Sequence, residues 1–286
     1  MKRLADCRTV VVGLGLMGGS LAGALRGRCR TVVGVARRRA TVERADRLGL
    51  IDDGTTDTEV AFREADIVVL ATPVRTIVAQ LRSLGPTVPP GCLVLDLGST
   101  KADVLAAMEG LPAGIEPLGA HPMCGKETSG VDSADPDLYR GCTFILCPLD
   151  RTSNAALALG RELAEAVGAE PLVLDGARQD RLVATLSHLP YLLACALVQT
   201  ADATTSADPA AWTIVAGGYR DTSRVAGCDV RMMLDILGTN REAVLRSAAV
   251  FRERFDRLVE LIATGAEEEL KSVLTGCRDE RRRMFP

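Results

Sequence analysis

Residues 9–21 read Thr9-Val10-Val11-Val12-Gly13-Leu14-Gly15-Leu16-Met17-Gly18-Gly19-Ser20-Leu21. A β-branched strand runs directly into G-x-G-x-x-G, and an apolar helical pattern follows, which is the order of a dinucleotide-binding fingerprint. Gly13 would make the tight turn, Gly15 would let the backbone approach a pyrophosphate, and Gly18 would let the helix pack on the strand. The pyrophosphate would bind the free N–H groups at the helix start, around Leu16 and Met17.

The first half of the chain alternates short apolar runs with helical patterns. Predicted strands cover residues 9–12, 31–35, 67–71, 92–97, 117–120, 143–147 and 171–174, and predicted helices cover residues 16–26, 41–48, 75–84, 101–108 and 154–167. Most of the strands are apolar throughout, as expected for strands covered by helices on both faces. The pattern predicts an α/β domain with a doubly wound, Rossmann-type sheet.

The pattern changes after Asp175-Gly176. Strand-like runs stop, and long helical periodicities cover residues 179–200 and 240–264. We therefore expect a dinucleotide-binding domain over residues 1–175 and an all-helical substrate and dimerisation domain over residues 176–286. The apolar surfaces of these helices exceed what one small bundle needs, which favours a homodimer through the helical domain.

The end of the second predicted strand bears on the choice of cofactor. It reads Ala36-Arg37-Arg38-Arg39, with no carboxylate before Glu43. An NAD site would place an acid there for the ribose hydroxyls, whereas arginine attracts the 2′-phosphate of NADP through charge-assisted hydrogen bonds. Arg37 and Arg38 therefore favour NADP, with NAD still possible. The alternative is a solvated basic helix start, which the helix dipole disfavours.

Composition and charge indicate which other classes of partner are expected. The 286 residues are 47% hydrophobic and 25% charged, as in soluble globular proteins, and the net charge of −3 argues against nucleic acid or an anionic membrane as a partner. Nine cysteines without C-x-x-C pairs and two histidines make no zinc pattern, so we expect no metal and reduced thiols. The N-terminal apolar stretch is too short for a signal peptide, and the longest apolar run, 189–198, is half a membrane span. We expect a cytoplasmic protein.

Two polar loops follow predicted strands. They are Thr72-Pro73 and Gly98-Ser99-Thr100-Lys101. The carboxyl ends of strands line the ligand crevice of a doubly wound fold, so Thr72, Pro73 and Ser99 are expected to face the cofactor. Ser99 and Thr100 could instead be helix N-caps, and both roles are compatible.

Both histidines are candidate site residues. His121 ends a predicted strand and is followed by Pro122, a setting that fits a general base with a pKa near neutrality, although a buried structural histidine has the same pattern. His188 lies in an apolar helix expected to face the cleft between the domains. A core histidine and a ligand contact both remain open there.

A glycine pair interrupts the helical half and precedes two arginines. Arg220 and Arg224 bracket Asp221. A guanidinium matches a carboxylate with two hydrogen bonds, so either arginine could bind an acidic substrate. The alternative is an ion pair of either arginine with Asp221.

Five stretches carry a family resemblance. They are Val12-Gly13-Leu14-Gly15-Leu16-Met17-Gly18-Gly19-Ser20, Gly98-Ser99-Thr100-Lys101, His121-Pro122-Met123-Cys124-Gly125, Ser187-His188-Leu189-Pro190 and Gly218-Tyr219-Arg220-Asp221-Thr222-Ser223-Arg224. In this order they resemble the prephenate and arogenate dehydrogenases of tyrosine biosynthesis. The histidine and arginine stretches are far more specific than the glycine fingerprint.

The resemblance implies an oxidative decarboxylation of a cyclohexadienol, giving 4-hydroxyphenylpyruvate or tyrosine. By this likeness, His121 takes the proton of the C4 hydroxyl as hydride leaves C4 for the nicotinamide, and Ser99 aligns the hydroxyl and the imidazole. Arg224 would bind a substrate carboxylate, with Arg220 nearby, and His188 would support the cleft or the substrate.

Two departures leave prephenate and arogenate both open. The arginines that follow Ala36 resemble NADP-using arogenate enzymes, whereas Lys126-Glu127-Thr128-Ser129-Gly130 resembles the prephenate-type relatives.

Two other functions compete. Another NADP-dependent hydroxyacid dehydrogenase, of the 6-phosphogluconate type, would need a lysine base in its helical domain, and Lys271, near the C-terminus, is the only lysine after Lys126. A non-catalytic NADP-binding sensor would need neither His121 nor Arg224.

Overall fold

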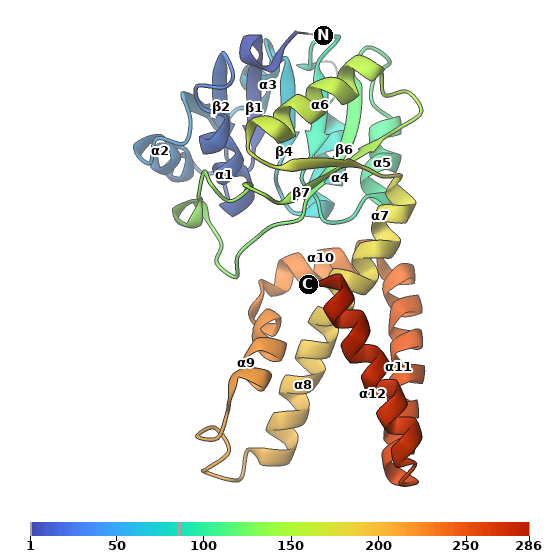
Figure 1. The fold of residues 1–286 in the computed structure, drawn as a ribbon. Coiled ribbons are helices and arrows are strands. Elements are labelled where there is room, and N and C mark those ends of the chain that lie inside the picture. The colour runs from blue at the N-terminus through green and yellow to red at the C-terminus, as the bar shows by residue number, and fades with distance from the viewer. Residues whose placement is uncertain (1, 85–86, 286) are drawn as a thin grey trace. The chain divides into compact units, whose positions relative to one another are not determined.

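A single mostly parallel sheet organises the first part of the chain (Figure 1). The computed structural model describes residues 2–84 and 87–285, and within them the sheet has eight strands in the order β3-β2-β1-β4-β5-β6-β7-β8. The strands are β1 (Arg8–Val12), β2 (Thr31–Val35), β3 (Asp53–Thr55), β4 (Ile67–Leu70), β5 (Leu93–Asp96), β6 (Glu116–Pro122), β7 (Thr143–Pro148) and β8 (Glu170–Val173). The order reverses between β1 and β4, which places a topological switch point at their carboxyl ends.

Helices cover both faces of the sheet. They are α1 (Leu16–Leu25), α2 (Arg39–Arg47), α3 (Thr58–Phe62), α4 (Val74–Ser83), α5 (Ala102–Glu109) and α6 (Asn154–Ala166). Successive strand residues enter opposite cores: Val11 lies in the core that α1 and α6 cover, whereas Val10 lies in the core under α4 and α5. Strands buried on both faces explain the apolar runs, and the predicted fold class is confirmed.

The pairing of β6 with β7 departs from a fully parallel sheet. These two strands are antiparallel, while the other neighbouring pairs are parallel. The connection between them, residues 123–142, contains one short 3-10 turn, η3 (Val131–Ser133), and no crossover helix. A parallel return would need such a crossover. The sequence pattern did not reveal this reversal because β7 is as apolar as its parallel neighbours.

Two elements near the start of the chain were also missed. β3 is three residues long, and α3 is a five-residue helix capped by the Asp57 carboxylate, which accepts from the N–H groups of Glu59 and Val60. Elements this short carry too few apolar positions for a period to be read.

The rest of the chain is helical. Its elements are α7 (Gly176–Val183), a π-helical turn η4 (Ala184–His188), α8 (Leu189–Thr205), α9 (Gly217–Ser223), a 3-10 turn η5 (Arg224–Gly227), α10 (Val230–Thr239), α11 (Arg241–Ala263) and α12 (Glu267–Met284). The sheet and the helices up to α10 form one compact unit that ends at Arg241, and a second unit begins at Glu242. A domain boundary near residue 176 stays a prediction.

Candidate active site

The glycine loop after β1 has the backbone conformation that the fingerprint requires. Gly13 has φ +100°, and a Cβ atom there would lie 2.8 Å from the Ala71 carbonyl oxygen. A Cβ atom at Gly18 would overlap the carbonyl oxygen of Gly13, so the helix–strand approach also excludes a side chain. Gly15 is the N-cap of α1 and has open space around its Cβ position. The loop therefore leaves the N-terminus of α1 accessible to a ligand.

The first turn of α1 is held by a tyrosine that is distant in the sequence. The Tyr139 hydroxyl donates to the carbonyl oxygen of Met17 at 2.7 Å, next to Leu16 at the start of the helix. Tyr139 is fully buried. The turn that would bind the pyrophosphate is thus fixed in place by a contact 122 residues away in the sequence.

The arginines after β2 differ in whether they form an ion pair. Arg39 forms an ion pair with Glu43 at 3.0 Å, one turn further along α2. Arg37 and Arg38 are exposed and hold no ion pair or side-chain hydrogen bond within residues 2–84 and 87–285. Arg38 is the N-cap of α2, where the dipole favours an anion. These two guanidinium groups are available for a phosphate.

The loop after β4 contains Thr72 and Pro73. The Thr72 hydroxyl donates to Oε1 of Gln80 at 2.7 Å, and Pro73 is the N-cap of α4. Both residues lie at the carboxyl edge of the sheet, beside the end of β1, which Gly13 follows. They are where a crevice-lining loop is expected.

Ser99 and Thr100 are not the N-cap of α5, so that interpretation was wrong. Lys101 holds the N-cap position, and the Asp180 carboxylate accepts from the N–H groups of Lys101 and Ala102 at 2.7 and 2.8 Å. The Thr100 hydroxyl instead hydrogen-bonds Thr239 Oγ1 at 2.7 Å. A carboxylate from α7 therefore caps α5, and Ser99 is half-buried after the end of β5.

A buried ion pair lies under this edge of the sheet. Lys101 and Asp96 are both 0% exposed, and Nζ lies 2.5 Å from Oδ2. Asp96 also accepts from the N–H groups of Gly98 and Ala120, at 2.7 and 3.0 Å. Removing either charge would leave the other buried without its partner, which costs about 3–5 kcal/mol. The sequence signal was a charged pair in an otherwise apolar strand–turn segment, and its importance was missed.

His121 lies near the end of β6 and is 8% exposed. Burial lowers the pKa of its imidazole to about 3, with further lowering by the positive charge of Lys101 and by His188. The expectation of a pKa near neutrality was therefore wrong for the ligand-free protein. The ring is neutral at physiological pH, which is the form a general base requires.

Gln179 of α7 sets the orientation of this ring, and sequence reasoning did not single it out. Its side-chain Nε2 lies 2.9 Å from His121 Nδ1 and donates to the Ser99 carbonyl oxygen at 3.1 Å. Its Oε1 is buried and has no hydrogen-bond partner within residues 2–84 and 87–285. In this arrangement Nδ1 accepts from the amide. If the amide instead turns its oxygen toward Nδ1, giving up the hydrogen bond to Ser99, the ring proton sits on Nδ1 and Nε2 is free to accept a proton.

His188 is in the π-helical turn and is 1% exposed. Its Nδ1 lies 3.3 Å from Asn240 Nδ2, and the same amide donates to the Asp180 carbonyl oxygen at 2.8 Å. Burial lowers the pKa of His188 to about 4. These contacts are those of a buried histidine held by Asn240, and a contact with substrate stays a prediction.

Arg224 forms an ion pair with Glu127 rather than with Asp221. Glu127 belongs to the loop that follows His121, so the pair joins that loop to η5. Both side chains are substantially exposed, and exposed pairs contribute about 0–1 kcal/mol. A substrate carboxylate could therefore replace Glu127 at little cost. Arg220, on α9, is exposed.

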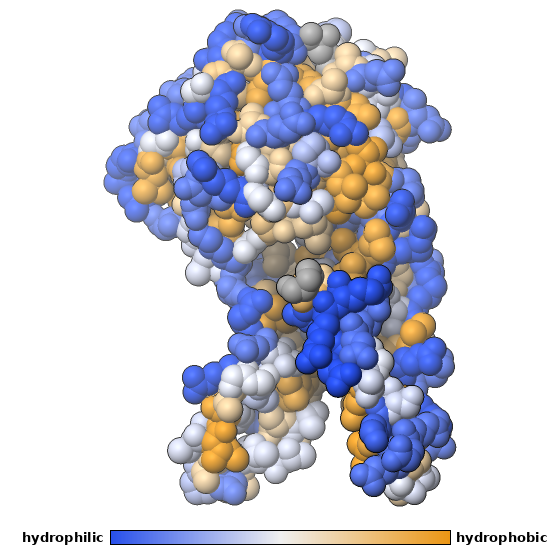
Figure 2. All heavy atoms as spheres, viewed as in Figure 1, coloured by the Kyte–Doolittle hydropathy of each residue, from blue (hydrophilic) through white to orange (hydrophobic). Residues whose placement is uncertain are grey.

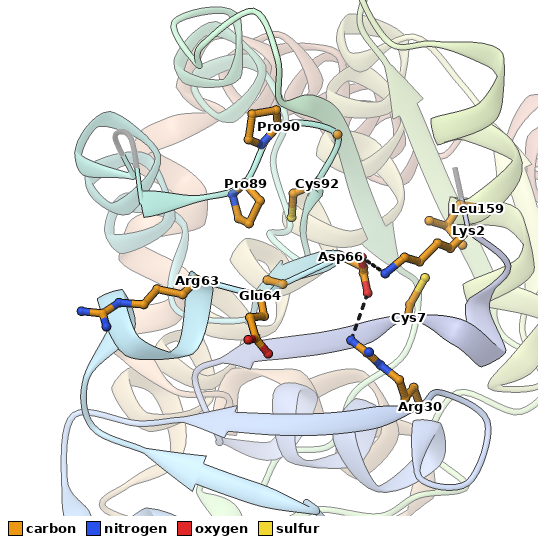
Figure 3. Close-up of a pocket in the computed structure, with 12 residues that line it drawn as sticks. Lys2, Cys7, Arg30, Arg63, Glu64, Asp66, Pro89, Pro90, Cys92 and Leu159 are labelled. Carbon is orange, nitrogen blue, oxygen red and sulfur yellow. Dashed lines mark ion pairs between the residues drawn. The ribbon is translucent and has the colours of Figure 1, made fainter.

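One pocket lies at the opposite edge of the sheet (Figure 3). Its volume is about 570 Å³, and its lining includes Cys7, Cys92 and Asp66, which precede β1, β5 and β4. Lys2 and Arg30 pair there with Asp66 at 2.8 and 3.6 Å. Ligands of doubly wound folds bind at the carboxyl ends of strands, so this pocket is separate from the candidate site.

The fold, the glycine loop and the buried base define a nucleotide-dependent oxidoreductase. The family models for the nucleotide-binding and dimerization domains of prephenate dehydrogenase match residues 21–173 and 175–276. The prephenate dehydrogenase of Bacillus subtilis is 30% identical over 267 residues, covering 91% of this chain and 70% of that protein. The cyclohexadienyl dehydrogenase of Zymomonas mobilis is 30% identical over 239 residues, covering 82% and 81%.

Solved structures agree. Prephenate dehydrogenase from Aquifex aeolicus, in complex with hydroxyphenyl propionate and NAD+, has a TM-score of 0.90 at 31% identity and covers 99% of this chain and 100% of that one. Synechocystis arogenate dehydrogenase has a TM-score of 0.82 at 30% identity, covering 97% and 100%. The chain belongs to the prephenate dehydrogenase family. It is an NAD(P)-dependent oxidoreductase with prephenate or arogenate dehydrogenase function.

Proposed function

We propose that the protein oxidises and decarboxylates prephenate or arogenate with His121 as the general base. The observation that carries this assignment is a neutral, buried imidazole at the carboxyl edge of the sheet, held by Gln179. The proton of the substrate C4 hydroxyl passes to His121 as hydride leaves C4. Bound NAD(P)+ supplies the hydride acceptor. The ring carboxylate then departs as carbon dioxide, its bonding electrons make the ring aromatic, and His121 returns its proton to the phenolate oxygen.

The negative charge of the substrate would raise the pKa of His121. In the ligand-free protein burial makes His121 a weak base. A substrate carboxylate brings negative charge beside the imidazole, which favours its protonated form and raises its pKa. Ser99, at the same edge, would align the C4 hydroxyl with the ring.

Substrate binding is assigned to the helical residues. Arg224 would exchange Glu127 for a substrate carboxylate, with Arg220 contributing positive charge nearby. His188 would hold the floor of the site through Asn240. Glu127 also places a carboxylate near the arginine, where the amine of arogenate would be favoured over the ketone of prephenate.

For the cofactor we propose NADP over NAD. Gly13, Gly15 and Gly18 would admit the pyrophosphate to the first turn of α1, and Arg37 and Arg38 would bind the 2′-phosphate. Two observations support this preference. Position 36 holds alanine rather than an acid, and within residues 2–84 and 87–285 neither arginine forms an ion pair.

We further propose a homodimer formed through the helical part. Residues Gly176–Thr205 form one long apolar helical run, long enough to cross a membrane, of which 28% of the most apolar window is buried. Large apolar side chains are exposed on this segment and its neighbours, and Figure 2 shows hydrophobic surface in the region of α9. A partner subunit would cover this surface. A monomer in light scattering at micromolar concentration would contradict the proposal.

A His121→Asn variant tests the function. It keeps a polar side chain in the site but removes the base, so turnover is expected to fall roughly 10²–10⁴-fold, while NADP affinity measured by calorimetry stays unchanged. A non-catalytic sensor would show no turnover in the parent protein. Full turnover in the variant would overturn the assignment of His121.

A further inference from the structure

Two cysteines face each other just beyond the paired ends of β6 and β7. The antiparallel register runs to Pro122 and Phe144. One residue further, the Met123 N–H still donates to the Thr143 carbonyl oxygen at 2.8 Å. The strands therefore remain in register past the end of the sheet.

The next position in that register places Cys124 opposite Cys142. Hydrogen-bonded and non-hydrogen-bonded positions alternate along an antiparallel pair, and Met123 occupies a hydrogen-bonded one. Cys124 and Cys142 thus form a non-hydrogen-bonded pair, for which Cα atoms lie about 4.5 Å apart. That separation is within the range of about 4.4–6.8 Å that a disulfide spans.

We propose that Cys124 and Cys142 are a reversible dithiol–disulfide pair, with a hydroperoxide as the oxidant. Both residues are free thiols in the structure, and both are half-buried, which leaves them accessible to a small oxidant. Cys7, Cys92 and Cys147, in contrast, are fully buried. The proposal does not rest on the proposed function.

The two thiols are not equivalent. The Cys124 thiol hydrogen-bonds Cys142, which lowers the pKa of Cys142 and raises that of Cys124. The thiolate is the nucleophile in thiol chemistry, so Cys142 is expected to react first. Cys124 then acts as the resolving thiol.

The chemistry balances in two steps. The Cys142 thiolate attacks the hydroperoxide, the O–O bond breaks, and the sulfur becomes a sulfenic acid while the alkoxide or hydroxide leaves and takes a proton. The Cys124 thiol attacks that sulfur, the S–S bond forms, and water leaves. Two thiols lose two hydrogen atoms in total, and with hydrogen peroxide one equivalent yields two waters.

Cys124 lies close in the chain to His121, so the oxidation state of the pair bears on the candidate active site. Both cysteines are partly buried and pack against the same core as Met17 of α1, and Cys124 follows His121 in the chain by three residues. Without a resolving thiol, a sulfenic acid at Cys142 would proceed to irreversible sulfinic acid. The pair therefore protects a site three residues from His121 from permanent oxidation.

The test treats the full-length protein with stoichiometric hydrogen peroxide and maps tryptic peptides by mass spectrometry. We expect a crosslink between residues 102–126 and 141–151, two hydrogen atoms lighter than the separate peptides and lost with dithiothreitol. Because the second peptide also contains Cys147, fragmentation must place the bond on Cys142. No crosslink, or one between other cysteines, would overturn the proposal.

Two variants sharpen this result. In Cys124→Ser, two equivalents of hydrogen peroxide should add two oxygen atoms to Cys142, because no resolving thiol intercepts the sulfenic acid; recovery of unmodified Cys142 would contradict its role as the reactive thiol. Cys277→Ser, which removes an exposed cysteine elsewhere, should form the crosslink as the parent protein does. Loss of the crosslink in that control would mean that Cys277 takes part, against the proposal.

Discussion

The side-chain amide of Gln179 lies 2.9 Å from Nδ1 of His121 and also hydrogen-bonds the backbone of Ser99. One residue of α7 thereby connects the two residues assigned to the reacting hydroxyl. The adjacent Asp180 caps α5 through two N–H groups. The start of the helical part is thus built into the catalytic edge of the sheet.

Gln179→Leu should lower kcat about fivefold with little change in KM, since one hydrogen bond worth about 1 kcal/mol is lost at the ring. Gln179→Glu should restore turnover, because a carboxylate accepts the Nδ1 proton and leaves Nε2 free to act as the base. Its negative charge should also move the acidic limb of the kcat/KM profile to higher pH. A Leu variant with parental kcat would show that Gln179 does not position the base.

Arg224→Ala should raise KM roughly ten- to hundredfold, because charge-assisted hydrogen bonds are worth about 1.5–3 kcal/mol. Arg231→Ala, an exposed arginine on α10, is the matched control and should leave KM unchanged. Steady-state kinetics at saturating NADP measure both. Equal effects in the two variants would indicate a loss of general surface charge rather than of a carboxylate-binding group.

The two buried histidines make stability depend on pH. An unfolded histidine binds a proton as pH falls below about 6.5, whereas folded His121 and His188 do so only near pH 3 and 4. The unfolded state therefore binds more protons below about pH 6.5. As the pH is lowered, the free energy of unfolding should decrease by up to about 1.4 kcal/mol per pH unit for each histidine. Urea unfolding between pH 6.5 and 5 measures the slope. His121→Asn should reduce it, and an unchanged slope would contradict a neutral buried His121.

Ala36→Asp should shift cofactor preference toward NAD, because the new carboxylate repels a 2′-phosphate and can bind ribose hydroxyls. Arg38→Ala should weaken NADP about tenfold or more and leave NAD unchanged. Arg39→Ala is the control, since Arg39 is already paired with Glu43. The ratio of kcat/KM for the two cofactors reports the outcome. A ratio that does not move would exclude this loop from the choice.

The glycine loop and the doubly wound sheet could be predicted from sequence because their causes are local. Gly13 and Gly18 occupy positions that reject a Cβ atom, and the strands are apolar wherever helices cover both faces. The antiparallel β7 could not be predicted, since strand direction depends on the connection rather than on the strand's composition.

In the candidate site, too, some features could be predicted from the sequence and others could not. His121 and Arg224 stand in recognisable motifs, but the contacts that determine their chemistry come from distant residues. Gln179 is 58 positions from His121, and Glu127 is 97 from Arg224. The low pKa of His121 results from three-dimensional burial beside Lys101, which no spacing rule contains.

The most direct test of the central claim is a four-way initial-rate assay with prephenate and arogenate, each with NAD and NADP. It follows the absorbance of the reduced nicotinamide, which reports the hydride step itself. We predict turnover with at least one of the two substrates, faster with NADP than with NAD. No reduction of either cofactor with either substrate would contradict the proposed oxidative decarboxylation.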